Sequence, residues 1–397
     1  MKIGVFTNFY PPTQRGGAEL VAQRVADELV RRGHKVFVLS TMPFSGMSSL
    51  RPRVVENHLE RVYRFFPLNL FHISQAASHV FPVRLLWHAI DLFGPIPHRL
   101  VDRLIDQEEP DVILTHNLKG LGVRSARCVQ KSHVRHIHTL HDVQLSLPSG
   151  LLLYGKEQDW INTGFLRKWY EHLAHYAIGK PDVVVSPSQF LADFYRERGF
   201  FHASPVHILP NPAPRRLEKT SLAILAPGPV RLFFVGQLEP HKGLLVLLEA
   251  IKQLTVPFEL HIAGDGSLAT MIAQQAQGDP RIFFHGFISL EHIKKILARS
   301  DAVILPSLCY ENSPTVIYES FQVGVPVIAS RIGGIPELIQ DGQNGLLVEP
   351  GNTDDLLRVL NQFVSQRELF ASRRIQIQHD AERYSLRLYV DRLEELF

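Results

Sequence analysis

The chain has 397 residues, a formal net charge of +3 and a hydrophobic content of 45%. Because single hydrophobic cores stop growing near ~250–300 residues, this length predicts two domains. No apolar run reaches the ~18–20 residues of a membrane span, and the first residues do not have the pattern of a secretion signal. Two cysteines, Cys128 and Cys309, are too few for a disulfide framework or a zinc site. A soluble, cytoplasmic protein is therefore expected.

Short apolar runs alternate with helical periodicities along the first half of the chain, which is typical of a parallel α/β sheet. The expected elements are a helix over 18–32, closed by Gly33, and strands over 2–7, 35–40, 111–115, 136–140 and 183–186. Residues 1–200 hold 24 Lys and Arg against 18 Asp and Glu. This excess favours an anionic acceptor or a membrane surface as partner, although two halves of a chain also differ in charge without a function.

The α/β pattern restarts after a proline-rich segment at 207–214, which indicates a domain boundary. The expected elements of the second half are a helix over 244–254 and strands over 231–235, 258–263, 281–284, 302–305 and 326–330. The last residues form an amphipathic helical pattern that needs a surface to cover. We therefore predict an N-terminal domain over 1–206, a C-terminal domain over 207–380 and a terminal helix over 381–397.

Doubly wound sheets bind ligands outside the carboxyl ends of their strands, and two such domains place the ligand in a cleft between them. Gly16 and Gly17 follow the first strand and open the first helix, where backbone N–H groups can approach a phosphate or a sugar. An ordinary tight turn is the alternative. The Gly-x-Gly-x-x-Gly pattern of dinucleotide-binding enzymes is not found at this place. His116 follows a later strand and can reach a bound sugar, although a lone histidine is more often structural.

Three further polar residues, His138, His141 and Asp142, end the next strand at spacings that would suit a metal ion. A carboxylate-rich Asp-x-Asp stretch does not accompany them. The sequence therefore predicts no metal site.

Strand ends of the second domain carry residues suited to a nucleotide. The pair Gly236-Gln237 follows the first strand, and Lys242 stands just before the next helix. An ammonium group beside helix N–H groups makes a clamp for a diphosphate. Gly264 and the pair Gly286-Phe287 follow two further strands, where glycine permits close approach of a nucleoside. Each of these glycines alone is also a common turn signal.

The most informative segment runs from Glu311 to Glu319. Pro314 suits the first position of a helix, and Ser313 can cap its N–H groups. Those N–H groups, around Thr315 and Val316, attract phosphate. The two carboxylates on either side can accept hydrogen bonds from sugar hydroxyls. This combination predicts a nucleotide-sugar site, whereas two solvated helix charges would be the alternative reading of the pair alone.

In this order along nearly the whole chain, these segments resemble glycosyltransferase family 4, whose members are retaining enzymes of the GT-B fold that use nucleotide-sugars. The segments that carry the resemblance are 16–19, 110–116, 210–212, 236–243, 264–266, 285–287, 311–319 and 333–337. The fold it implies is a pair of doubly wound domains facing a central cleft, with the terminal helix crossing back to the first domain.

The resemblance also implies roles for the donor side of the site. Glu319 would bind the ribose hydroxyls of the donor, and Glu311 would contact the hydroxyls of the transferred sugar. The amides around Ser313, Pro314, Thr315 and Val316 would hold phosphate, and Lys242 would neutralise the diphosphate leaving group. Gly236, Gly264, Gly286 and Phe287 would border the donor nucleotide.

On the first domain, the resemblance implies that His116 hydrogen-bonds the sugar near the reacting carbon and that Gly16 and Gly17 line the junction of donor and acceptor. One position departs from the family, because Gln237 stands where an arginine is usual. Glutamine keeps two N–H donors but loses the charge with which arginine grips a diphosphate. Arg15 or Arg331 could supply that charge instead.

The expected function is thus a metal-independent retaining glycosyltransferase with a nucleoside-diphosphate sugar as donor and no further cofactor. A nucleotide-sugar 2-epimerase and a non-catalytic nucleotide-sugar-binding relative remain alternatives. The acceptor is open. The stretch 51–103, in which arginines alternate with aromatic residues, points to an anionic or lipid-linked acceptor and to peripheral contact with the inner membrane face. A core helix pair is the alternative for this stretch, and a nucleic-acid partner is not expected.

Overall fold

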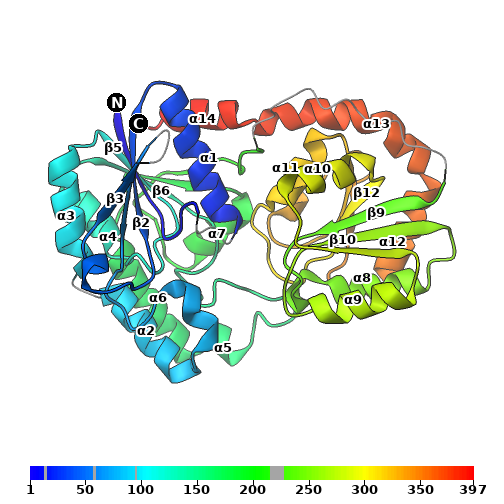
Figure 1. Cartoon of the computed structure of the whole chain (residues 1–397), viewed down its shortest axis with the longest axis horizontal. Helices are drawn as coiled ribbons and strands as arrows, with labels where there is room; N and C mark the ends of the chain where they lie inside the picture. Colours follow the sequence, from blue (N-terminus) through cyan, green and yellow to red (C-terminus); the bar gives the residue numbers. More distant parts are fainter. Residues whose placement is uncertain (13–15, 57–59, 94–95, 215–227) are drawn as a thin grey trace. The chain divides into compact units, whose positions relative to one another are not determined.

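The computed structural model describes residues 1–12, 16–56, 60–93, 96–214 and 228–397 (Figure 1). These residues form two compact units. Unit 1 comprises 1–151, 158–211 and 386–397, and unit 2 comprises 152–157 and 212–385. The change from unit 1 to unit 2 at Asn211 and Pro212 falls inside the proline-rich segment 207–214. The segment 152–157 belongs to unit 2 although it lies far from the rest of that unit in the sequence.

Unit 1 is built on an eight-stranded sheet with the order β3-β4-β2-β1-β5-β6-β7-β8. Its strands are β1 (Lys2–Phe6), β2 (Lys35–Thr41), β3 (Arg53–Glu56), β4 (Arg61–Phe65), β5 (Val112–Thr115), β6 (Arg135–Thr139), β7 (Val183–Ser186) and β8 (Val206–Ile208). All neighbours are parallel except β3 and β4, which are antiparallel. Most of the parallel strands, such as β1, β5 and β7, are apolar because helices cover both faces of such a sheet.

The helices of unit 1 surround this sheet (Figure 1). They are α1 (Gly17–Arg31), α2 (Phe81–Phe93), α3 (Ile96–Glu108), α4 (Ser125–Lys131), α5 (Trp160–Thr163), α6 (Phe165–Ile178), α7 (Gln189–Glu197) and α14 (Leu386–Glu394), with the short 3-10 turns η1 (Met47–Leu50) and η2 (Ile73–Ser78). No helix in the described ranges is both long and apolar enough to cross a membrane.

The stretch 51–103 contains the strands β3 and β4 followed by the helix pair α2 and α3. Five of its aromatic residues are buried in the interior of unit 1: Tyr63, Phe65, Phe66, Phe71 and Trp87. The alternation of arginine with aromatic residues therefore reflects core packing for these five side chains. The prediction that this stretch contacts an anionic or lipid-linked partner stays a prediction.

The terminal segment is not one continuous helix over 381–397, so that detail of the prediction is wrong. A 3-10 turn, η5 (Ala381–Tyr384), is followed by the extended residue Ser385 and then by α14. Tyr384 packs on Tyr318 of unit 2, whereas Leu386 and Val390 join the core of unit 1. The chain breaks the helix because the two stretches bury their apolar sides in different cores.

Helix α14 lies beside α1, as expected for a terminal helix that packs on the first domain (Figure 1). Arg32, at the end of α1, donates hydrogen bonds to Asp391 at 2.7 Å and to Glu394 at 2.8 Å. His34 lies 2.9 Å from Glu394. These polar contacts fix the register of α14 on unit 1.

Unit 2 is built on a six-stranded, fully parallel sheet with the order β11-β10-β9-β12-β13-β14. Its strands are β9 (Val230–Val235), β10 (Phe258–Ala263), β11 (Ile282–Gly286), β12 (Ala302–Leu305), β13 (Val327–Ser330) and β14 (Gly345–Val348). Its helices are α8 (Leu244–Lys252), α9 (Ala269–Gly278), α10 (Leu290–Arg299), α11 (Thr315–Gln322), α12 (Thr353–Ser365) and α13 (Arg367–Asp380), with the 3-10 turns η3 (Pro240–Lys242) and η4 (Ile335–Glu337). Both units are therefore doubly wound α/β structures, as the sequence predicts.

Candidate active site

On unit 1, the predicted residues lie at the carboxyl edge of the sheet. Gly16 directly precedes α1 and Gly17 opens it. An added Cβ at Gly16 would stand 3.2 Å from the Glu19 carboxylate, so a larger residue would crowd the first turn. The start of α1 thus presents backbone N–H groups and little side-chain bulk at the position that a ligand is expected to reach.

His116 lies at the end of β5 and is 2% exposed. Its backbone N–H donates to the Phe6 carbonyl at 2.9 Å, and its Nδ1 lies 2.9 Å from Nε2 of His141. Its other ring nitrogen, Nε2, is buried and has no hydrogen-bond partner among the described residues. Burial, with help from His141 and His138, holds the pKa of His116 well below its usual value. The imidazole is therefore neutral near pH 7 and can exchange a hydrogen bond with a ligand through Nε2.

Three pairs of side chains, from successive residues after and at the ends of β5 and β6, contact each other. Thr115 Oγ1 lies 2.8 Å from His138 Nδ1, His116 pairs with His141, and Asn117 hydrogen-bonds Asp142. A cavity of about 20 Å³ adjoins these residues, which is room for about one water molecule. Within the described ranges, no group of three His, Cys, Asp or Glu side chains is arranged to hold a metal ion.

The strand-end loops of unit 2 approach one another so closely that they require glycine. A Cβ at Gly264 would overlap the Gly236 carbonyl oxygen, and one at Gly243 would overlap the Pro306 carbonyl oxygen. All three glycines have positive φ, which other residues rarely adopt. Glu239 further ties the loops together, because it accepts hydrogen bonds from the Ser267 N–H and hydroxyl at 2.9 and 2.7 Å. Gln237 lies exposed in this loop system.

Lys242 and Glu311 form an ion pair, with Nζ 2.6 Å from Oε1. Their side chains are only 20% and 16% exposed. The Ser307 hydroxyl donates to the same carboxylate oxygen at 3.1 Å, and Cys309 Sγ lies 3.6 Å from it. Sequence reading anticipated neither this pair nor the two residues that complete it. Ser307 and Cys309 follow β12 closely, which is the one signal that could have found them.

Each member of the Lys242–Glu311 pair shifts the pKa of the other. Burial alone would raise the pKa of Glu311, but the Lys242 ammonium and the hydrogen bonds around the carboxylate hold it below the usual value. Burial alone would lower the pKa of Lys242, but the Glu311 carboxylate raises it above the usual value. Both groups are therefore charged at neutral pH.

Helix α11 begins at Thr315, one residue later than predicted, and Pro314 is its N-cap. Pro314 itself provides no side-chain cap. The Ser313 hydroxyl and the Tyr318 hydroxyl are hydrogen-bonded to each other, and capping of the helix by Ser313 stays a prediction. The first-turn N–H groups of Thr315 and Val316 remain at the mouth of the helix. Glu319 follows one turn later and is partly exposed.

A glycine turn after β13 packs against the backbone of Glu311. The Gly334 N–H donates to the Glu311 carbonyl at 2.7 Å. Gly333 has a φ of 60°, and a Cβ there would overlap the same carbonyl oxygen. Arg331, which precedes this turn, lies 3.7 Å from both Asp341 and Glu349. It is thus engaged with two carboxylates, and Arg15 lies outside the described residues.

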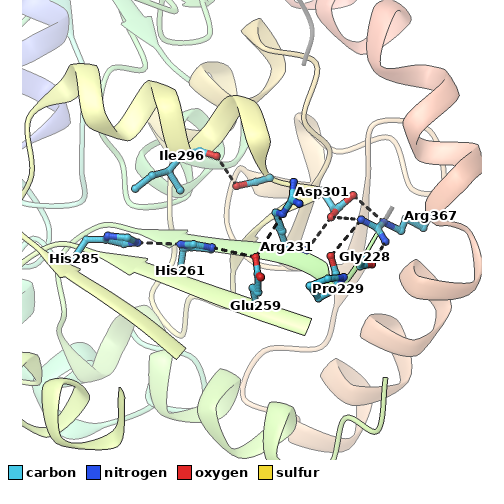
Figure 2. A network of polar contacts seen from close by, with 10 residues as sticks. Gly228, Pro229, Arg231, Glu259, His261, His285, Ile296, Asp301 and Arg367 are labelled. Carbon is cyan, nitrogen blue, oxygen red and sulfur yellow. Dashed lines mark hydrogen bonds and ion pairs between the residues drawn. The ribbon is translucent and has the colours of Figure 1, made fainter. Parts of the chain in front are cut away.

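A ladder of polar side chains supports the turn that contains Gly286 and Phe287 (Figure 2). His285 Nε2 lies 3.0 Å from His261 Nδ1, and the two rings stack with centroids 5.3 Å apart. Figure 2 shows His261 pointing on to Glu259, which Arg231 also contacts. Gly286 has a φ of 64°, and Phe287 is 86% exposed. The ladder holds one end of the turn while Phe287 projects into solvent.

Comparison with known proteins relates these features to a family. The family model described as Glycosyltransferase Family 4 matches residues 15–215, and the one described as Glycosyl transferases group 1 matches residues 229–366. An uncharacterized 42.6 kDa protein in the cps region of Klebsiella pneumoniae is 26% identical over 340 residues, which cover 85% of this chain and 87% of the relative. N-acetyl-alpha-D-glucosaminyl L-malate synthase of Bacillus anthracis is 23% identical over 389 residues, 93% of this chain and 89% of that protein. Lipopolysaccharide 1,2-N-acetylglucosaminetransferase of Salmonella typhimurium is 30% identical over 208 residues, 47% of this chain and 54% of that protein.

Two solved structures share the fold over the full length of this chain. Sucrose-phosphate synthase from Thermosynechococcus elongatus superimposes with a TM-score of 0.74 at 17% identity and is covered over 98% of its length. HepE of Anabaena in complex with UDP superimposes with a TM-score of 0.70 at 20% identity and is covered over 99%. These likenesses establish the GT-B fold.

Proposed function

Because the chain belongs to glycosyltransferase family 4 and is a glycosyltransferase that uses a nucleotide-sugar donor, we propose that it transfers the sugar with retention and without a metal ion. The acceptor group is a hydroxyl. The single observation that carries this proposal is the Lys242–Glu311 pair, a partly buried ammonium and carboxylate 2.6 Å apart. It supplies a fixed positive charge for a leaving group and a carboxylate for sugar hydroxyls.

The donor nucleotide is proposed to bind at the mouth of α11. The N–H groups of Thr315 and Val316 would receive phosphate, because a helix start combines orphan donors with a positive dipole end. Ser313 and Pro314 lead the chain into this position. Glu319, one turn along α11, would accept hydrogen bonds from the ribose hydroxyls.

The remaining donor contacts are proposed for the strand-end loops of unit 2. Gly236 and Gly264 allow the backbone to approach the nucleotide closely, and Gly286 and Phe287 border the base. Gln237 is proposed to donate amide hydrogen bonds to the diphosphate in place of the usual arginine. The positive charge of the clamp then rests on Lys242, because Arg331 is engaged with Asp341 and Glu349.

In the proposed reaction, the bond between the sugar's anomeric carbon and the diphosphate oxygen breaks, and Lys242 stabilises the charge that develops on that oxygen. The acceptor hydroxyl attacks from the same face of the sugar, and its proton passes to the departing phosphate oxygen. Glu311 would orient the sugar hydroxyls, and His116 would hydrogen-bond the sugar through Nε2. Gly16 and Gly17 would border the junction of donor and acceptor. The protein acts by positioning and electrostatics.

The acceptor is proposed to be anionic or lipid-linked. The positive excess of residues 1–200 supports this, as does the similarity over 47% of the chain to a lipopolysaccharide N-acetylglucosaminetransferase. Action in the cytoplasm, at the inner face of the membrane, is the location that follows from this acceptor.

A panel of UDP-, GDP-, ADP- and dTDP-sugars in a thermal-shift assay identifies the donor and tests the proposal. A rise in Tm with one class of nucleotide-sugar is expected. Transfer is then measured with that donor. Release of free nucleotide and an isomerised sugar without acceptor would indicate a 2-epimerase instead. Binding with neither transfer nor slow hydrolysis would indicate a non-catalytic relative.

A further inference from the structure

Large apolar side chains are exposed together on three neighbouring helices of unit 1. Trp160 of α5 is 68% exposed, and Phe165 and Trp169 of α6 are 78% and 53% exposed. In α2, Leu85 and Leu86 are 50% and 55% exposed. Single exposed apolar residues are common, but a contiguous group marks a surface that binds something.

Packing within unit 1 places these helices side by side. Helices α2 and α5 both contact α6, and His88 of α2 meets Tyr170 of α6 edge to face with centroids 6.2 Å apart. Figure 1 shows the three helices together on the same end of unit 1. We call the group of Val83, Leu85, Leu86, Trp160, Phe165 and Trp169 the apolar face.

Two of the three helices, α2 and α6, already bury their inner sides in unit 1, whereas the short α5 has no buried residue. Phe165 and Trp169 are four residues apart and therefore share one side of α6. Ala174, Ala177 and Ile178 of the same helix are buried, so α6 is anchored to the unit without help from its exposed aromatics. Burying those aromatics needs a partner outside unit 1.

Charge around the apolar face identifies the partner. Arg84 and Lys168 are exposed on these helices, whose described residues include no exposed Asp or Glu. Beside the helices, Lys180 is matched by the exposed Asp182, and Asp159 precedes α5. Glu171 of α6 does not offset Arg84 and Lys168, because Arg167, Arg198 and the Ser146 hydroxyl all contact its carboxylate. Tryptophans flanked by basic side chains are typical of surfaces that lie in the interface of an anionic membrane.

We propose that the apolar face docks unit 1 onto an anionic lipid bilayer, with Trp160, Phe165 and Trp169 inserted at headgroup depth and the basic side chains on the lipid phosphates. The helices lie on the membrane and do not cross it. The site includes α2, which lies in the stretch 51–103 that the sequence suggested, and it takes its aromatic members from α5 and α6. It adds a partner to the proposed function and does not depend on the donor chemistry.

Vesicle binding tests the proposal with the complete chain. Phosphatidylcholine vesicles with and without one quarter phosphatidylglycerol are mixed with the protein and sedimented. Co-sedimentation with the anionic vesicles is expected, weakened but not abolished by high salt, because charge contacts are screened whereas apolar insertion is not. The two exposed tryptophans report insertion directly through a blue shift and through quenching by brominated lipid. Trp87, which is 2% exposed, serves as the internal unquenched reference.

Matched variants locate the surface. The triple variant Trp160→Ser, Phe165→Ser, Trp169→Ser is expected to bind anionic vesicles at least ten-fold more weakly, and Lys168→Glu to bind less at low salt only. Ile375→Ser is the control, because Ile375 is 72% exposed on α13 of unit 2. Thermal shift with the donor nucleotide should be unchanged in all of them, which separates docking from donor binding.

Three outcomes would overturn the proposal. They are wild-type protein that stays in the supernatant with anionic vesicles, a triple variant that binds as tightly as wild type, and bound wild-type protein whose tryptophans brominated lipid does not quench. Sedimentation velocity tests whether a second copy of this chain, and not a membrane, binds the apolar face. A dimer that the triple variant dissociates, without vesicle binding by wild type, would show that the face joins two copies of this chain.

Discussion

Replacing Lys242 by methionine should destabilise unit 2 as well as weaken donor binding. Methionine keeps the apolar stem and removes the ammonium, which leaves the Glu311 carboxylate 16% exposed and without its counter-charge. Removing one partner of a fully buried pair costs about 3–5 kcal/mol. Because both side chains keep some contact with water, we expect a loss of about 2 kcal/mol at pH 8. For a unit of this size, that corresponds to a fall in Tm of about 4–8 °C.

The stability lost in the Lys242→Met variant should depend on pH in a defined direction. In the wild type the pKa of Glu311 is lowered, so the pair stabilises the fold above the unfolded pKa of about 4.3 and is lost as pH falls through the folded pKa. In the variant, burial without the ammonium raises the pKa of Glu311 instead. Its penalty is then absent below pH ~4 and grows as pH rises. The difference in Tm between the two proteins should therefore be largest at pH 8 and smaller at pH 4.5, where the penalty in the variant is nearly relieved but the wild-type pair still stabilises the fold.

Thermal unfolding from pH 4.5 to 8 measures this difference, and calorimetry with the nucleoside diphosphate measures donor affinity. Lys242→Met should bind the diphosphate about 10–100-fold more weakly, from the loss of one charge-assisted hydrogen bond of about 1.5–3 kcal/mol. The double variant Lys242→Met, Glu311→Gln should recover most of the stability at pH 8 but not the affinity. A Tm loss that is equal at pH 4.5 and pH 8 would refute the electrostatic reasoning. Unchanged affinity of Lys242→Met for the nucleoside diphosphate would contradict the proposal that Lys242 binds the leaving group.

Four further predictions address the rest of the site. Glu319→Ala should weaken binding of the nucleoside diphosphate in calorimetry, whereas Glu311→Gln should mainly lower kcat; equal affinity of Glu319→Ala and wild type would dismiss the ribose contact. Transfer should persist in EDTA, and a full loss that manganese or magnesium restores would overturn metal independence. Gln237→Arg should tighten nucleoside diphosphate binding several-fold, and a weaker complex would indicate that another cation already occupies that space. Burial lowers the pKa of His141 to about 4 and that of His116 well below its usual value. The pH profile of kcat should therefore show no transition from these two histidines between pH 6 and 8. The variant His141→Leu should lower kcat about five-fold, because it loses one hydrogen bond of about 1 kcal/mol. A histidine-like transition in wild type that shifts in the His141 variant would contradict a neutral pair.

Most central strands could be predicted because their own residues suffice to define them. Runs such as Val183–Ser186 and Ala302–Leu305 are short, apolar and bounded by turn residues, and a parallel strand covered on both faces needs that composition. The strands that were missed lie at sheet edges or carry charge. β3 is an exposed antiparallel edge strand, and β4 alternates Arg61 and Arg64 with apolar residues. β8 has three residues, and β14 has four and lies at the edge of the second sheet. Their strand conformation comes from the neighbour they pair with.

The sequence by itself determined which residues stand at strand ends and helix starts, because these positions follow from local composition, turn residues and spacing. His116, Lys242, Glu311 and the start of α11 were all placed in this way. Only the tertiary structure decided which of them meet. Lys242 and Glu311 are 69 residues apart, and they form a pair because β9 and β12 are neighbours in the sheet although two strands separate them along the chain. That strand order is a property of the packed core, and no local pattern encodes it.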